Sequence, residues 1–201
     1  MLEHLDEPIQ EGVAVVVASA AGDCTIFDCA STEGAQRLEL CHGYPFPATD
    51  AAQPRVSLFQ PGRGGARATV HRGRTRSTGA LRVYTVVLTK RTRGKRAAEQ
   101  DLGADLFVDG ARELEDAPLA RSRGFGDRVV LGADHLGRWP LRGAIRDFAL
   151  FRGRVPSAFA RGLERALAAK HGIELRGEDA EDSDGAAEED IDDDFDDDED
   201  A

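Results

Sequence analysis

Short runs in which apolar and polar residues alternate, separated by turn-forming residues, fill most of this 201-residue chain as far as residue 151. In residues 66–71, alanine and valine alternate with arginine, threonine and histidine, so an extended chain places the two sets on opposite faces. The 22 glycines and 8 prolines fall mostly between such runs, and no helical pattern separates the runs. We therefore expect an all-β protein with many tight reversals, and we exclude a doubly wound α/β fold.

The alternation predicts nine strands, which are enough for a sandwich of two sheets. They are residues 14–19, 25–29, 37–41, 55–59, 66–71, 81–89, 106–108, 129–133 and 144–151. The run 81–89 is apolar on both faces over its second half, which places it in the middle of a sheet. One short helix is expected near the C-terminus, with Ser157 as its N-cap and Gly172 as its stop, and its apolar stripe closes an end or edge of the sandwich.

The charges divide the chain into two parts. All 26 Lys and Arg lie at or before Arg176, whereas residues 177–201 hold 16 of the 37 Asp and Glu. We predict a folded domain over residues 1–176, where 26 bases against 21 acids give a net charge of +5. Residues 177–201 are predicted to form a disordered acidic tail, because like charges repel and too few apolar residues are present to form a core. The tail could fold back on the basic part of the chain or bind a basic partner.

Composition also bears on the compartment. The longest uncharged apolar run, residues 13–21, is far shorter than the roughly 20 residues of a membrane-spanning helix. The segment before it carries four acids and no Lys or Arg, unlike a signal peptide. Three cysteines are too few, and odd in number, for a secreted disulfide framework. These features favour an intracellular or virion-associated protein in a reducing environment.

Five segments between residues 106 and 173 occur in an order that carries a family resemblance. They are Leu-Phe-Val-Asp-Gly at 106–110, Val-Leu-Gly at 130–132, Leu-Arg-Gly-Ala-Ile-Arg-Asp-Phe-Ala-Leu-Phe at 141–151, Val-Pro-Ser at 155–157 and Leu-Ala-Ala-Lys-His-Gly-Ile at 167–173. Together they resemble the C-terminal half of laminin G-like domains of the concanavalin A-like lectin and glucanase superfamily. Upstream, Tyr84 stands where that family has a tryptophan. The resemblance implies a jelly-roll-like sandwich of two antiparallel sheets, and it does not by itself imply a ligand.

Trp139, the only tryptophan, lies in a Gly-Arg-Trp-Pro segment just before the last predicted strand. An aromatic side chain at a sandwich rim can stack on a sugar ring or a partner side chain, and His135 and Arg138 could donate hydrogen bonds beside it. The alternative is that Trp139 covers the edge of the core. We predict from these three residues a non-catalytic recognition or structural module that binds carbohydrate or protein through rim loops, with the acidic tail modulating its interactions.

A block of the chain without any acid lies between Asp50 and Glu99 and carries 12 positive charges. Two of its segments, 72–76 and 90–96, are predicted to be flexible basic turns at the two ends of the strand 81–89, and they need not form one patch. Their basic residues are Arg72, Arg74, Arg76, Lys90, Arg91, Arg93, Lys95 and Arg96. The alternative function is therefore a polyanion-binding (nucleic acid) or packaging-associated protein that the acidic tail autoinhibits. A simpler interpretation is that the arginines make the domain soluble.

Catalytic and metal sites are not predicted, and no cofactor is expected. The residues Glu113, Glu115 and Asp116 form the nearest approach to a glycosidase pair, but they follow a turn and are expected in a solvated loop. The cysteine and histidine residues that could bind zinc do not have the spacing of a zinc knuckle. A calcium site needs six or more oxygen ligands, and the sequence does not bring that many together. The zinc set is Cys24, Cys29, Cys41 and His42, and the acids considered for calcium are Asp105, Asp109 and Asp134.

Two details of these sets follow from the expected strands. Alternation puts Cys24 and Cys29 on opposite faces if one strand holds both, whereas Cys29 and Cys41 could face each other across a hairpin. Asp109 is better explained as the turn residue that precedes Gly110 than as a calcium ligand.

Overall fold

The computed structural model describes residues 2–4, 9–31, 37–43, 54–61, 68–91, 100–122, 126 and 128–176. Within these ranges lie eleven strands and one helix. They are β1 (Leu2–His4), β2 (Gly12–Ala20), β3 (Cys24–Ala30), β4 (Arg37–His42), β5 (Arg55–Gln60), β6 (Thr69–Arg76), β7 (Leu81–Arg91), β8 (Gln100–Val108), β9 (Ala111–Ser122), β10 (Arg128–Leu131), β11 (Gly143–Arg152) and α1 (Ser157–His171). The acidic tail lies outside the described residues.

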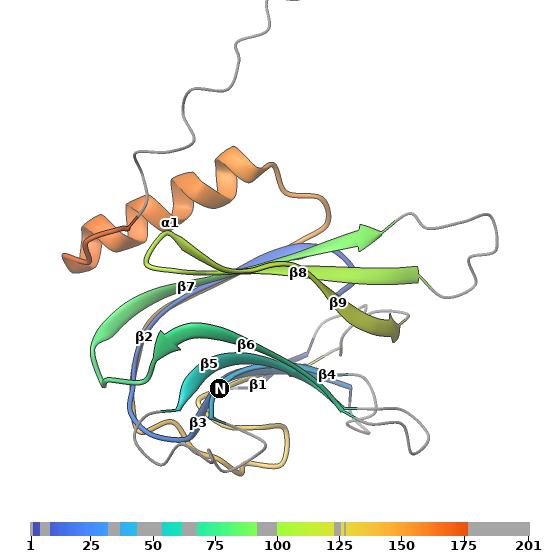
Figure 1. The fold of residues 1–201 in the computed structure, drawn as a ribbon, viewed down its shortest axis with the longest axis horizontal. Coiled ribbons are helices and arrows are strands. Elements are labelled where there is room, and N and C mark those ends of the chain that lie inside the picture. The colour runs from blue at the N-terminus through green and yellow to red at the C-terminus, as the bar shows by residue number, and fades with distance from the viewer. Residues whose placement is uncertain are drawn as a thin grey trace, which may run out of the picture.

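The strands form two sheets that stack as a sandwich (Figure 1). The six-stranded sheet has the order β1-β10-β3-β4-β5-β6, and the five-stranded sheet has the order β11-β2-β7-β8-β9. Every neighbouring pair is antiparallel. This confirms the predicted all-β sandwich of two antiparallel sheets with one short C-terminal helix, and β7 lies in the middle of its sheet as expected.

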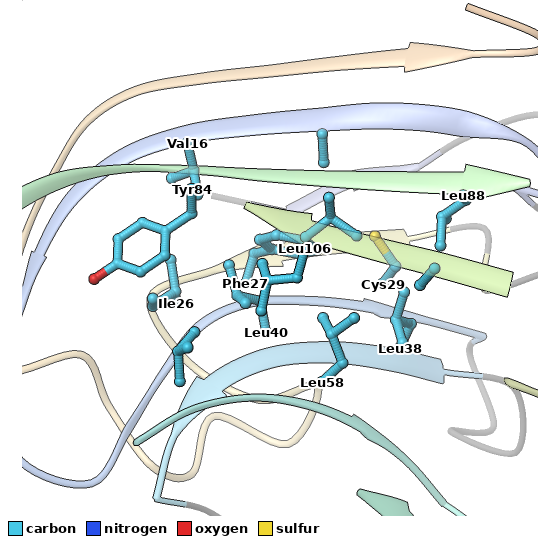
Figure 2. Close-up of a cluster of buried hydrophobic side chains, with 14 of the residues drawn as sticks. Val16, Ile26, Phe27, Cys29, Leu38, Leu40, Leu58, Tyr84, Leu88 and Leu106 are labelled. Carbon is cyan, nitrogen blue, oxygen red and sulfur yellow. The ribbon is translucent and has the colours of Figure 1, made fainter. Parts of the chain in front are cut away.

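The main core lies between the sheets, where inward-facing side chains of the two sheets meet (Figure 2). Val16 and Tyr84 of the five-stranded sheet pack with Phe27 and Leu40 of the six-stranded sheet, and all four are at most 1% exposed. Burial of such a side chain contributes about 1.5–3 kcal/mol. The Tyr84 hydroxyl finds a partner in His42 Nε2 at 3.1 Å, so a polar pair joins the two layers inside the core.

A second, smaller core lies on the outer face of the five-stranded sheet, where α1 packs (Figure 1). Val15 and Val83, both fully buried, contact Ala160 and Ala168 of the helix. The expectation that the helix closes an end or edge of the sandwich is therefore wrong. Residues 13–18 are apolar at every position, so β2 presents an apolar surface on both faces and needs a cover on each.

The predicted ends of α1 are half right. Gly172 ends the helix with a φ of 64°, and backbone N–H groups at this end donate to Ala168 O and Ala169 O, as expected for a glycine stop. Ser157 is the first helical residue rather than the N-cap, which is Pro156 without a side-chain cap. Among the described residues, no helix is long and apolar enough to cross a membrane.

Two stretches that sequence assigned to turns or loops are strands. The basic segment 72–76 belongs to β6, and the acidic segment 113–116 belongs to β9. Both β6 and β9 are edge strands of their sheets. Edge strands tolerate charge and proline, which explains why Pro118 fits in β9 and why the alternation of apolar residues was too weak to identify either segment.

Candidate functional site

The chain between β10 and β11, residues 132–142, forms a loop at the rim of the sandwich that we call the rim loop. Its base is closed by Leu141 N–H donating to Gly132 O at 2.8 Å. It is docked on β3 by two further backbone bonds, from Gly132 N–H to Ile26 O and from Thr25 N–H to Trp139 O, both 2.9 Å. The rim loop is therefore fixed to the sheet by backbone hydrogen bonds.

Inside the rim loop, the fully buried carboxylate of Asp134 organises the chain around itself. Its Oδ1 accepts from the backbone N–H groups of Leu136 at 3.0 Å and Arg138 at 2.6 Å. Its Oδ2 accepts from Arg138 Nε at 3.0 Å, so the guanidinium is fixed although its side chain is 55% exposed. Charge-assisted bonds of this kind are about twice as strong as neutral ones.

A buried charge network, formed by Asp28, Arg37 and Glu39 with Thr25 and His135, lies between the rim loop and the outer face of the six-stranded sheet. Asp28 and Glu39 are directly opposite each other on β3 and β4. Arg37 donates to Asp28 through Nε at 3.2 Å and Nη2 at 2.9 Å, and it also pairs with Glu39, which accepts from the Thr25 hydroxyl. Asp28 Oδ2 accepts from the backbone N–H of His135 at 2.8 Å, which ties the rim loop to the network.

Burial dominates the electrostatics of this network. Removal from water raises the pKa of Glu39 to about 7, although Arg37 and the Thr25 hydroxyl favour its charged form. Burial also raises the pKa of Asp28, against the opposing effects of Arg37 and His135. Both carboxylates are 0% exposed and bonded to protein donors. Asp28 thereby ties the rim loop to the network, and neither carboxylate is exposed to solvent.

Beside the exposed Arg138 side chain, the rim loop presents two large apolar side chains to solvent. Leu136 is 62% exposed and Trp139 is 39% exposed. Trp139 also has a φ of 55°, in the left-handed region that a bulky residue rarely adopts and that the following Pro140 disfavours further. Such a conformation costs on the order of 1–3 kcal/mol and persists only where the surroundings hold it. The hydrogen bonds at the two ends of this segment supply that constraint.

The three residues predicted to bind a ligand therefore share one loop, but they do different things. Trp139 is exposed at the rim. His135 and Arg138 direct their side chains to the buried acids: His135 Nδ1 lies 3.3 Å from Asp28 Oδ2, and Arg138 is bound to Asp134. Sequence reasoning missed Leu136, whose position as an apolar residue next to a glycine inside a turn-rich segment was the available signal.

The predicted polyanion-binding residues do not form one patch in the described part of the chain. Arg72, Arg74 and Arg76 are exposed on β6, which leads through a short turn to the start of β7. Lys90 and Arg91 lie at the other end of β7, about 30 Å away at the rise of an extended strand. Arg93, Lys95 and Arg96 lie outside the described residues.

The cysteines are buried and do not assemble with His42 into a ligand set, since no group of three or more metal-binding side chains occurs among the described residues. Cys24 and Cys29 both face the main core, because a bulge after Thr25 shifts the alternation of β3; the expectation of opposite faces is wrong. Cys29 lies opposite Leu38 rather than Cys41, which corrects the hairpin pairing. Burial raises the pKa of Cys29 to about 12.

The three acids considered for calcium have separate structural roles. The carboxylate of each accepts hydrogen bonds from backbone N–H groups. Asp105 accepts from Asp116 N–H at 2.6 Å, and Asp134 serves the rim loop. Asp109 accepts from Val83 N–H at 3.0 Å and pairs with Arg82, so it fixes the turn between β8 and β9 with a φ of 50°.

The acids considered for a glycosidase pair also have structural partners. Glu113 accepts from Thr75 N–H at 3.0 Å and the Thr75 hydroxyl at 2.6 Å, and it also accepts from Arg74 N–H. These bonds join β9 of one sheet to β6 of the other. Glu115 points to Arg112 on the same strand, with a side chain that is 73% exposed. The two glutamates therefore do not share a site.

Among solved structures, one similar to this chain is a fragment of laminin. The LG4-5 domains of the mouse laminin alpha1 chain align with 78% of this chain and 40% of that chain, with a TM-score of 0.46 and 11% sequence identity. No family model matches the chain, and the search of curated proteins found no match. The fold itself is defined by the strand order and register. These confirm the antiparallel two-sheet sandwich that the laminin G-like sequence motifs implied.

Proposed function

We propose that this protein is a non-catalytic recognition module that binds a carbohydrate or a protein through the rim loop. The observation that carries the proposal is the contrast within residues 132–142. Their backbone is bound to buried carboxylates and to β3, while Leu136 and Trp139 stay exposed. A rigid loop loses little entropy on binding, and an exposed aromatic ring supplies contact area.

The chemistry of the loop sets the kind of ligand it fits. Trp139, which is 39% exposed, carries a flat aromatic ring of the kind that stacks on a sugar ring. Asp134 holds the guanidinium of Arg138, the preceding residue. Leu136 extends the apolar surface and would contact either a sugar or a side chain of a protein partner. The buried acids Asp28 and Glu39 have no place in this function beyond support of the loop.

A glycan array tests the proposal. Wild-type protein should bind a defined set of glycans, and Trp139→Ala should lose them. Phe159→Ala is the matched control, because Phe159 is 47% exposed, lies on α1 away from the rim loop and should leave binding unchanged. Loss of binding in both variants, or in neither, would contradict the rim loop as the site. Absence of any glycan signal would leave protein partners as the surviving form of the proposal.

A second candidate function is binding of a polyanion such as nucleic acid through β6. The observation that favours it is the register of β5 and β6, which sets Arg55 directly opposite Arg76. Like charges in this arrangement destabilise a sheet, and a bound anion relieves the repulsion. Such binding would be electrostatic and would weaken steeply with salt.

Retention on a heparin column tests the second candidate. Removal of residues 177–201 should raise the salt concentration needed for elution if the tail competes for the arginines of β6. Arg72→Ser with Arg76→Ser should lower it again. Equal retention of all three proteins would refute this function.

A further inference from the structure

Four arginines gather at the end of β5 and β6 that adjoins the turn to β7, and we call them the arginine cluster: Arg55, Arg72, Arg74 and Arg76. All four are exposed. Arg76 lies opposite Arg55, and Arg72 lies opposite Ser57, two residues further along the same face of β5. Residues directly opposite in an antiparallel pair have Cβ atoms about 5 Å apart, so the side chains repel at short range.

No acid of the described residues neutralises the arginine cluster. None of its four guanidinium groups forms an ion pair within the described part of the chain. Glu113 contacts β6 within the cluster, but its carboxylate accepts from the backbone N–H groups of Arg74 and Thr75 and from the Thr75 hydroxyl. The carboxylate thus holds the strand in place, and the cluster keeps an unpaired positive charge.

The last described residue leaves the fold at the same end of the sandwich. Arg176 N–H donates to Asp109 O at 2.6 Å. Asp109 in turn pairs with Arg82, near the start of β7 at Leu81. Only four residues separate Leu81 from Arg76, the last residue of β6. The acidic tail therefore begins near the arginine cluster and not near the far end of β7.

The tail has the charge and the length to reach the cluster. It contains 16 acids and no base. Extended, residues 177–201 would span about 80 Å, whereas the two stacked sheets are only about 10 Å apart. Because both parts belong to one chain, the contact is intramolecular and is favoured by the effective concentration that a covalent connection supplies.

We propose that the acidic tail docks on the arginine cluster of its own chain. In this interaction many carboxylates of the tail face four guanidinium groups. It therefore needs no fixed register and is screened by salt. The proposal rests on the surface of the second candidate function but not on its external ligand, and it explains why like charges are tolerated across β5 and β6.

Paramagnetic broadening tests the proposal in the full chain. A nitroxide label is attached through Ala187→Cys, since the three native cysteines are buried. Amide signals of residues 72–76 should lose about threefold in intensity at about 0.01 M salt and recover at about 1 M, because the screening length falls from about 30 Å to about 3 Å. The arms that use wild-type sequence at β6 do not depend on the folding of any arginine variant.

A matched pair of variants locates the contact. Arg72→Ser, Arg74→Ser and Arg76→Ser together should abolish the broadening over 72–76. Arg146→Ser, Arg154→Ser and Arg165→Ser remove the same charge from exposed positions on β11, α1 and the chain between them, and should leave it unchanged. Spectra away from the substitutions show whether each variant is folded.

Three results would overturn the proposal. The first is no salt-sensitive broadening over 72–76 in the wild-type sequence. The second is broadening that survives loss of the cluster arginines. The third is broadening that appears when the label and the observed amides are on different chains, which would show association between copies instead. No arm involves Trp139 or an added polyanion, so failure here is distinguishable from failure of either candidate function.

Discussion

Replacement of Glu39 by glutamine should change how the free energy of unfolding depends on pH. Burial raises the pKa of Glu39 from 4.5 to about 7, so between these values the folded protein holds a proton that the unfolded chain has released. Stability from this group is therefore complete below pH 4.5 and is lost as pH rises toward 7. At 1.36 kcal/mol per pKa unit, the loss is about 3 kcal/mol.

His42 acts in the opposite direction over an overlapping range. Burial lowers its pKa from 6.5 to about 4, so between these values the unfolded chain holds the extra proton and stability falls as pH falls. The magnitude is again about 3 kcal/mol. Asp28, whose pKa is raised by burial, adds to the effect of Glu39. The wild-type protein should thus show a shallow pH dependence between pH 4.5 and 6.5, because the two effects oppose each other.

Urea unfolding at steps of half a pH unit from pH 4.5 to 7.5 gives the free energy of unfolding of wild type and of Glu39→Gln under identical conditions. The free energy of unfolding of Glu39→Gln minus that of wild type should rise by about 3 kcal/mol across this range, because only wild type loses the Glu39 contribution. Glu115→Gln is the control, since its side chain is 73% exposed and should give a flat difference. A flat difference for Glu39→Gln as well would refute the reasoning.

Three further predictions concern residues that hold the fold. Glu113→Gln should lower the free energy of unfolding by about 2–3 kcal/mol in urea, because three charge-assisted bonds between the sheets are weakened; a loss no larger than that of Glu115→Gln would contradict this. Asp109→Ala should cost about 2–4 kcal/mol in thermal unfolding, because Arg82 and Val83 N–H lose their acceptor and a left-handed φ remains; an unchanged midpoint would show that the turn does not depend on this carboxylate. The thiols of Cys24, Cys29 and Cys41, whose pKa values are raised by burial, should react with a thiol reagent more than about tenfold faster in denaturant than in the native state; equal rates would place them at the surface.

The sandwich could be predicted because its signal is local. Most strands carry their own alternation of apolar residues, and the doubly apolar pattern of β7 reports its central position directly. The strands that escaped prediction are those where alternation is weak. Residues 113–116 of β9 are mostly acidic, and a charged edge strand near a proline has the composition of a loop.

The candidate site was only partly predictable, for a different reason. Trp139, His135 and Arg138 could be recognised as a cluster in sequence, but Asp28, the buried acid that contacts His135, could not. Asp28 lies 107 positions before His135, and only the folded sheet brings them together. The faces of Cys24 and Cys29 depend in the same way on a bulge that no residue pattern in β3 announces.

Hydrogen exchange of the rim loop is the most direct test of the claim that buried carboxylates hold an exposed apolar loop ready for binding. In wild-type protein, the amides of Leu136 and Arg138 should exchange about a hundredfold more slowly than in an unfolded chain, although the Leu136 side chain is 62% exposed. Asp134→Ala should remove that protection while the amides of β7 stay protected. Exchange of Leu136 and Arg138 at the unfolded rate in wild type would contradict the account.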